Sequence, residues 1–520
     1  MAEIKQTNGQ MIIDYMARDY DSLLGSMRAL IPAKLPEWKE FESEADFGNV
    51  LLQLIAHMGD IQNYYLDRAA NESFLATAQT RRSIIHHLWL IGYKLGTAAP
   101  ASASLTLTVP ADRTEIITIS KGDAFATKSQ KNKPSVRFEY ARDTALTIDC
   151  NTLPLDDTGK KFYTGIPVEE GRLIQNEILG ISNGKANQHF MLAHPQLILR
   201  SLGGGQAINR DIVLLTELGG IIEAWTLQES LAFSREGQRD YVVEIDEEDK
   251  ATIVFGDGAF GAVPANGATI TATYRVGGGS KGNVIANSIQ TIVAAPQLVL
   301  IGAKVTNKLP ATGGAERESI AHAALHAPAV FRSQKRAVTA EDYQALALDF
   351  QGVGKVRAVP ANWNTVTLYV SPSGGGQVSD VLRANLLAYF EDKRAIATLV
   401  EIEDVDYVSI YVSAEVGVKS YYSQEEIKEK VQAAAGALLA YENVDFAQIL
   451  YLSKFYEAIE AIEGVAFVTI TEYRRAGPAG PLEEKEGKLV MGDNEIPKIP
   501  DGPGEEAYAG GIRVTVTGGY

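Results

Sequence analysis

A serine between two glycines is the first candidate for chemistry in this sequence. Gly180-Ile181-Ser182-Asn183-Gly184 has the Gly-x-Ser-x-Gly spacing of a nucleophile elbow, in which a sharp strand-to-helix turn exposes the serine hydroxyl. The residues that follow, 185–189, do not lead into a helical pattern. We therefore expect a glycine and asparagine turn at this place, and no catalytic serine.

Two histidines four residues apart have the spacing of zinc ligands. His322 and His326 fall on one face of an expected helix, as the two histidines of helical zinc sites do. Ala323 stands where a metalloprotease carries its general-base glutamate, and no downstream cysteine or histidine completes a ligand set. We expect no metal here and no other cofactor.

Two further segments contain residue types that bind phosphate or calcium. Arg275–Asn283 has three consecutive glycines, but Ser280 precedes Lys281, whereas a phosphate-binding loop places lysine before serine at the start of a helix. Asp246-Glu247-Glu248-Asp249 is acidic, but it lacks the glycine and the closing glutamate of an EF-hand loop. A tight turn and a solvated hairpin tip are the expected structures. Because no pair of carboxylates stands out as a glycosidase pair either, we do not expect an enzyme.

The composition limits the partners that the chain can have. Its 520 residues carry a formal net charge of −17, which disfavours nucleic acid and anionic membrane surfaces and favours basic or mixed-charge proteins. Cys150 is the only cysteine, so an intrachain disulfide is excluded. We expect no membrane span, no cleaved leader, and assembly in a reducing cytoplasm.

The first 95 residues read as helical. From Phe47 to Tyr65 apolar residues recur in steps of three and four, and Asp46 places negative charge at the amino end. A second helix is expected from Thr80 to Ile91, with Gly92 as its C-cap. The apolar face of the first helix either packs on the rest of the chain or belongs to a bundle shared with another subunit. Its interface candidates are Phe47, Leu51, Leu54, Ile55, Met58, Ile61 and Tyr65.

Between about residues 100 and 300 the period of the apolar residues changes from helical to two. Ser104–Val109 alternates in this way, and similar short runs, separated by glycine and aspartate, continue to Tyr274. Residues 150–240 mix strand signals with Gly203-Gly204-Gly205. We expect a mostly β domain that carries an insertion.

After about residue 310 helical and strand patterns alternate. Leu309–Gly314 reads as a linker or turn, and Thr339 with Asp342 resembles a capping box. Residues 476–520 are rich in glycine and proline and end in an expected strand, Ile512–Thr517, which indicates an extended arm or a flexible hairpin. The predicted class is α+β multidomain, with an N-terminal helical segment, a central mostly-β domain and C-terminal split βαβ-type α/β domains. The expected boundaries are 1–98, 99–308 with an insertion at about 150–240, 309–400, 401–475 and 476–520.

One glycine-rich stretch is more specific than any of these patterns. Phe255–Gly267 reads as a strand end, a Gly-Asp-Gly turn and a proline bend, and Tyr274–Val284 adds a second glycine turn. The glycines allow positive φ where the chain reverses. The motif residues are Phe255, Gly256, Asp257, Gly258, Gly261, Pro264, Gly267, Tyr274, Gly282 and Asn283.

This stretch resembles the signature of the baseplate J-like family, which includes inner baseplate wedge proteins of contractile-tailed phages and of phage-tail-like injection systems. Asn307–Ser319 resembles the link into the α/β part of that family, and Arg336–Tyr343 resembles the helix start that follows. Ala45–Gly48 is similar to the family's N-terminal region. These segments stand in the expected order, so the resemblance covers roughly residues 10–475.

The resemblance implies an architectural role without catalysis in a virion tail baseplate or an injection-particle baseplate. In the family, two copies of the J-like chain join one partner to form a wedge, and six wedges close a ring around the tail hub. The N-terminal helices pair with the partner in a bundle, and the C-terminal domains pair between copies. The implied partners are therefore a second copy, a partner wedge protein, the tail hub and the sheath-initiating proteins.

The alternative is a tail-associated adhesin or glycan-cleaving enzyme. Such proteins usually show long repetitive β segments or a trimeric stalk pattern, and this sequence shows neither. A stand-alone enzyme would need a site, which the sequence does not supply.

Overall fold

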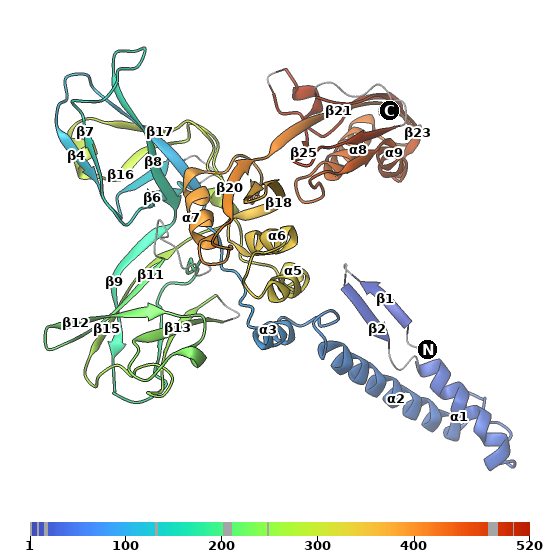
Figure 1. Ribbon diagram of the computed structural model, residues 1–520. Helices are drawn as coiled ribbons and strands as arrows, with labels where there is room; N and C mark the ends of the chain where they lie inside the picture. Colours follow the sequence, from blue (N-terminus) through green and yellow to red (C-terminus); the bar gives the residue numbers. More distant parts are fainter. Residues whose placement is uncertain are drawn as a thin grey trace. The chain divides into compact units, whose positions relative to one another are not determined.

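A computed structural model describes residues 3–7, 10–14, 19–129, 134–200, 211–246, 249–476, 487–502 and 504–519 (Figure 1). The chain divides into two compact units, one of Met1–Leu95 with Glu318–Gln334 and one of Gly96–Arg317 with Lys335–Tyr520. Helical and mostly-β parts follow one another, so the predicted α+β multidomain class is confirmed. Within the described ranges, no helix is long and apolar enough to cross a membrane.

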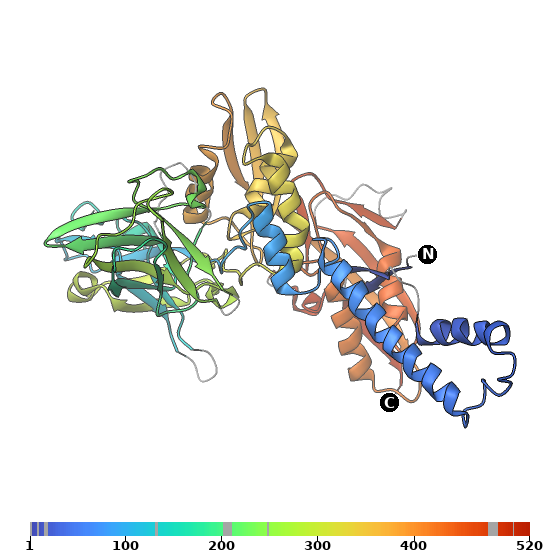
Figure 2. The ribbon, with the colours of Figure 1, turned by 90° about the horizontal axis from the view of Figure 1, so that it is seen from below.

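The smaller unit is helical apart from one hairpin. Its helices are α1 (Tyr20–Lys34), α2 (Phe47–Glu72), α3 (Arg81–Leu90) and α5 (Ile320–Ser333), and α1 lies alongside α2 (Figure 2). The hairpin pairs β1 (Glu3–Thr7) antiparallel with β2 (Gln10–Asp14), which differs from the all-helical expectation for residues 1–95. The dipeptide Asn8-Gly9 between these strands is a strong hairpin signal that the helical interpretation passed over.

The ends of the predicted helices are set by local hydrogen bonds. Asp46 caps α2 by accepting from the backbone N–H of Asn49 at 3.0 Å. At the end of α3, Gly92 adopts φ +72°, and its N–H donates to Trp89 while that of Tyr93 donates to Leu88. This pair of bonds is a Schellman motif, so the predicted C-cap is confirmed.

The larger unit begins with a β domain built on a six-stranded sheet of order β16-β5-β6-β8-β3-β17. A two-stranded sheet and the short α4 (Pro296–Leu300) complete it. The core consists of inward residues such as Leu105, Phe125, Phe138, Ile166 and Val168. The strands are β3 (Ser102–Val109), β4 (Ile116–Ile119), β5 (Ala124–Thr127), β6 (Arg137–Tyr140), β7 (Leu146–Asp149), β8 (Lys161–Glu170), β16 (Ile289–Ala294) and β17 (Lys304–Asn307).

A second β domain is inserted between β8 and β16. Its seven-stranded sheet has the order β10-β14-β13-β12-β11-β15-β9 and encloses a core that includes Trp225, Phe255 and Tyr274. The inserted strands run from Arg172 to Val276, later than the expected 150–240, because β8 pairs with β3 and β6 of the first sheet. Gly203-Gly204-Gly205 lies outside the described residues. The strands are β9 (Arg172–Ile181), β10 (His189–Met191), β11 (Ile212–Leu218), β12 (Ile221–Leu227), β13 (Asp240–Ile245), β14 (Ala251–Phe255) and β15 (Thr269–Val276).

An α/β part follows, in which a three-stranded sheet of order β18-β19-β20 packs with two helices. Thr339 and Asp342 form the capping box of α6, with bonds in both directions between side chain and backbone. The box therefore fixes the helix start that the sequence indicated. The elements are α6 (Ala340–Asp349), β18 (Val353–Asn362), β19 (Thr365–Pro372), α7 (Asp380–Phe390) and β20 (Leu399–Asp404).

The last part is a sheet around the long strand β21 (Asp406–Val418), and the described tail is built into it. β25 (Glu495–Lys498) and β26 (Arg513–Gly518) both pair parallel with β21, so these residues belong to the sheet and do not form an extended arm. The expected strand Ile512–Thr517 is present as β26, one residue later. Ile496 and Ile512 are fully buried, and Ile512 begins the alternation of apolar and polar residues that predicted the last strand. The other elements are α8 (Gln424–Leu438), β22 (Ile449–Tyr451), α9 (Leu452–Glu460), β23 (Val465–Arg475) and β24 (Lys488–Val490).

Candidate assembly surface and signature motif

The apolar residues of α2 lie on a face that no described part of the smaller unit covers. Phe47 exposes 76% of its surface, Met58 60% and Tyr65 63%. The other interface candidates are also exposed, namely Leu51, Leu54, Ile55 and Ile61. Their contact with a partner remains a prediction, but each of them is free to make one.

The opposite face of α2 is polar and small, and it is the face that packs against the unit's own chain. Asn49 and Ala56 are buried there, and Gly59 lies beside Leu23 of α1. The Asn49 side chain accepts from the Arg28 guanidinium at 2.8 Å and donates to the Ser43 carbonyl at 2.9 Å. A soluble helix normally turns its apolar face inward, so α2 has the reverse arrangement.

The exposed residues of α2 repeat with the period of a coiled coil. From Phe47 to Tyr65 the steps are four, three, four, three and four, which places six of them at the a and d positions of a heptad. Val50, Ile55 and Tyr64 flank this seam and are uncharged and exposed. With these apolar residues at the flanking positions, the apolar stripe of α2 is as wide as that of a helix in a bundle. The seam is the set Phe47, Leu51, Leu54, Met58, Ile61 and Tyr65.

The first half of the glycine motif forms a tightly folded turn after β14. Phe255 is buried with its ring centroid 4.7 Å from that of Trp225. A Cβ on Gly256 would collide with the carbonyl oxygens of Phe260 and Gly261, so no side chain fits there. The Asp257 carboxylate accepts from the backbone N–H of Phe260 at 2.7 Å, and the two hydrogen bonds from Phe260 and Ala259 lower the pKa of this carboxyl.

Replacing Gly256 with alanine is therefore expected to destabilise the inserted domain by about 1–3 kcal/mol, because backbone atoms must move to admit the methyl group. Urea unfolding followed by the fluorescence of Trp225, which lies in that domain's core, measures the loss. Gly25→Ala is the matched control, since a Cβ at Gly25 of α1 meets nothing within 4 Å. That change should stabilise its helix by about 0.5–1 kcal/mol. Equal effects of the two substitutions would contradict the argument.

The bend around Pro264 holds the serine that the sequence first pointed to. The Ser182 hydroxyl donates to the Pro264 carbonyl at 2.8 Å and accepts from Gln188 at 3.0 Å. Gly267 has φ +86° and donates its N–H to the carbonyl of Ser182 at 2.8 Å. No helix follows Ser182, and β10 begins at His189. The hydroxyl thus joins two turns, and the remaining motif glycines Gly258 and Gly261 also have positive φ.

The second half of the motif binds the chain's own carboxylates and amides. The N–H of Gly278 donates to Glu170 at 2.6 Å, and the N–H of Ser280 donates to Glu316 at 3.0 Å. A Cβ on Gly282 would meet Ala101 at 2.7 Å. These backbone N–H groups of the glycine loop 277–282, which in a phosphate-binding loop would hold the phosphate, are therefore already hydrogen-bonded to Glu170 and Glu316.

Asn283 fixes the segment that was expected to be a linker. Its amide nitrogen donates to the Gly314 carbonyl at 2.7 Å, and its amide oxygen accepts from the Gly314 N–H at 2.8 Å. Thr312 pairs with Ser102 through backbone hydrogen bonds of 2.8 and 3.1 Å. Leu309–Gly314 is thus bound to the first residue of β3 and to Asn283, and it is not a free linker.

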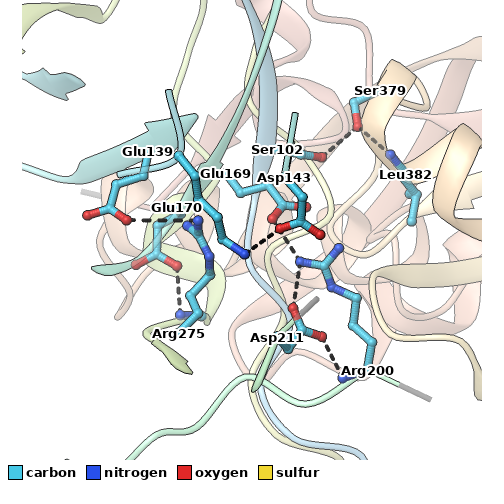
Figure 3. A network of polar contacts seen from close by, with 12 residues as sticks. Ser102, Glu139, Asp143, Glu169, Glu170, Arg200, Asp211, Arg275, Ser379 and Leu382 are labelled. Atoms are coloured by element: carbon cyan, nitrogen blue, oxygen red, sulfur yellow. Dashed lines mark hydrogen bonds and ion pairs between the residues drawn. The ribbon is translucent and has the colours of Figure 1, made fainter. Parts of the chain in front are cut away.

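A buried network of charges lies beside the motif, at the junction of the two β domains (Figure 3). Arg275 follows the motif residue Tyr274 and faces Glu139 at 3.8 Å, and both side chains are 1% exposed. Arg200 contacts Glu169 at 2.8 Å and Asp211 at 3.2 Å. Sequence reasoning missed these residues, although an arginine in a core strand is a signal that a buried carboxylate must face it.

The remaining residues that could bind a metal, namely the two histidines of α5 and the described residues of the acidic turn at 246–249, do not form a site. The rings of His322 and His326 are 4.0 Å apart, His322 is bonded to Glu318 at 2.8 Å, and burial lowers the pKa of His326. Over the part of the chain that the structure describes, no group of three metal-binding side chains occurs. Asp246 accepts from the N–H of Lys250 in a turn, while Glu247 and Glu248 lie outside the described residues.

Comparisons with known proteins identify two domains. Residues 19–90 match the bacteriophage baseplate protein N-terminal domain, and residues 335–403 match the baseplate J-like central domain. The first match contains α1, α2 and α3, and the second contains α6 and the three-stranded sheet. No curated protein matches the chain.

Among solved structures, the chain is similar to a chain in the 6-fold symmetrised cryo-EM structure of the anti-feeding prophage (AFP) baseplate. The identity is 14%, the TM-score is 0.33, and 93% of this chain and 99% of that chain are covered. It is also similar to a chain of the TssK-TssF-TssG baseplate subcomplex of the type VI secretion system, with 8% identity, a TM-score of 0.31, and coverage of 69% and 96%. These TM-scores are too low to establish a common fold. From these two matched domains, the chain is a structural protein of a tail baseplate that contains a baseplate J-like central domain.

Proposed function

We propose that this chain is a wedge subunit, which pairs with a second copy and a partner wedge protein and helps to close a ring around the tail hub of a contractile phage tail or injection particle. The single observation that carries this proposal is the exposed seam of α2. We also propose that the subunit has no catalytic role, because its motif residues make turns and bury charges instead of converging on a cavity.

The energy available at the seam supports a stable partner. Moving an exposed leucine, isoleucine or methionine side chain out of water contributes about 1.5–3 kcal/mol. The six seam residues would together contribute on the order of 10 kcal/mol, from which the entropy of association must be subtracted. This gain is sufficient for a lasting complex, and it requires a helix or helices of matching length against α2.

The net charge of the chain indicates that its partner is neutral or basic. Two copies that each carry a net charge of −17 repel one another, so a complex of two copies gains from a neutral or basic third chain. The seam and its flanks are uncharged, which lets the helices approach closely without unpaired charges. A ring built from such units is closed by repeating the same contacts around one axis.

The test is co-expression of the chain with the products of neighbouring genes, followed by light scattering on the size-separated complex. A complex of two copies of this chain and one partner, in which hydrogen exchange is reduced over α2, supports the wedge proposal. A monomer or a simple trimer that binds none of the neighbours would contradict it and would favour a fibre or an enzyme instead.

A further inference from the structure

The inserted β domain is joined to the first β domain at two adjacent glycines. The chain leaves β8 through Gly171 and returns from β15 through Gly277. A Cβ on Gly277 would lie 2.8 Å from the Cα of Gly171, and a Cβ on Gly171 would lie 2.7 Å from the carbonyl oxygen of Val276. The two crossings therefore touch, and any side chain at these glycines would force them apart.

The carboxyl group of Glu170 is enclosed in this joint. One oxygen accepts from the N–H of Gly278 at 2.6 Å. A Cβ on Gly277 would be 3.2 Å from the other oxygen, and a Cβ on Gly282 would be 3.1 Å from the side chain's Cγ. The glycine loop 277–282 thus closes around the carboxyl because Gly277, Gly278 and Gly282, which line it, have no side chains.

Glu170 differs from the other acidic groups of the joint in its partners. Glu139 has Arg137 at 2.9 Å and Arg275 at 3.8 Å, while Glu169 and Asp211 share Arg200. Glu170 forms no ion pair with a lysine or arginine among the residues that the structure describes. The charged groups that act on it are Arg275 on β15 and Glu316 on the segment after β17, while Lys281 of the glycine loop is exposed. The other charged groups of the joint pair with one another, namely Arg137 with Glu139, and Arg200 with Glu169 and Asp211.

Burial raises the pKa of the Glu170 carboxyl above its ordinary value of 4.5. The Gly278 N–H and the charge of Arg275 oppose this effect, and the charge of Glu316 adds to it. The protonated form of Glu170 is therefore the one that the closed joint favours.

We propose that Glu170 binds a proton in the closed joint, and that this makes the attachment of the inserted domain to the first β domain tighter at mildly acidic pH than at alkaline pH. The direction of this pH dependence follows from the linkage between proton binding and the closed state of the joint. A carboxyl whose pKa is higher in the closed state stabilises that state below the ordinary pKa, and this stabilisation is lost as pH rises through the raised value.

The experiment compares wild-type full-length protein with Glu170→Gln by hydrogen exchange of a peptide that spans residues 276–283. Glutamine keeps an oxygen for the Gly278 N–H and has no charge, as the protonated acid does. The peptide is identical in both proteins, so its intrinsic exchange rates cancel at each pH. At about pH 8 the wild type should exchange several-fold faster than the variant, and at about pH 4 the two rates should converge, because a carboxyl with a raised pKa is mostly protonated below its ordinary pKa.

Glu139→Gln is the matched control in the same joint. It removes a carboxylate that faces two arginines, so its peptide should exchange faster than that of the wild type at about pH 8, opposite in sign to Glu170→Gln. A ratio of wild-type to Glu170→Gln rates that stays the same at both pH values overturns the proposal. So does faster exchange in Glu170→Gln at about pH 8.

Discussion

Replacing Met58 with glutamate is expected to prevent the chain from co-purifying with its partner while leaving its own fold unchanged. Met58 lies in the middle of the seam and is 60% exposed, so the charged side chain stays in water in the free protein. In the complex it would be buried without a partner charge, which costs about 3–5 kcal/mol. The dissociation constant should rise about 100- to 4,000-fold.

The measurement is titration of purified partner against wild type and Met58→Glu, with circular dichroism to compare the helix content of the free chains. Ala29→Glu provides the control, because Ala29 is exposed on α1 and the change adds the same charge to the same unit. Ala29→Glu should bind as the wild type does. If Met58→Glu binds equally well, the seam is not the interface, and the proposed bundle is wrong.

Replacing Arg275 with methionine is expected to destabilise the larger unit by about 3 kcal/mol. Methionine fills much of the space of the arginine stem, but Glu139 loses its buried cation and Glu170 loses an attractive charge. Removing one member of a fully buried pair is costly because the remaining charge cannot reach water. The change should be measured by equilibrium unfolding in urea.

The double variant Arg275→Met with Glu139→Gln separates charge from packing. Since the uncompensated carboxylate is then neutral, the double variant should be clearly more stable than the sum of the two single changes predicts. Additive losses would mean that Arg275 acts through its volume alone. The half-exposed Arg137, which also contacts Glu139, limits how complete the recovery is.

Local patterns were sufficient to predict the helices. Asp46 and Thr339 mark helix starts because a cap bonds to residues only three positions away, and both predicted starts are confirmed. The strands β8 and β9 were not predicted. β8 contains Gly165 and Pro167, and β9 is an edge strand that keeps polar residues on its surface, so neither shows a clear period of two.

The signature motif could be located from the sequence, but its surroundings could not. Gly256 and Gly267 stand out because turns need them, whereas the network depends on which strands are neighbours. Glu139 meets Arg275 only because β6 and β15 meet across the joint of two domains, and no local pattern specifies that contact. The pairing of the tail could not be predicted for a similar reason: a local alternation indicated the last strand, but nothing in the tail specifies that β25 and β26 pair with β21.

The touching glycines at Gly171 and Gly277 also bear on how this chain can change over time. Because both ends of the inserted domain lie at one point, the segment Arg172–Val276 can be lengthened or exchanged without changing the path of β8 or β16 of the first sheet, provided that Glu139 and Glu169 keep a cation in place of Arg275 and Arg200. The join is a natural boundary for recombination, at which one module can replace another. The same point is the place where an engineered particle can accept a foreign domain whose own termini are close together.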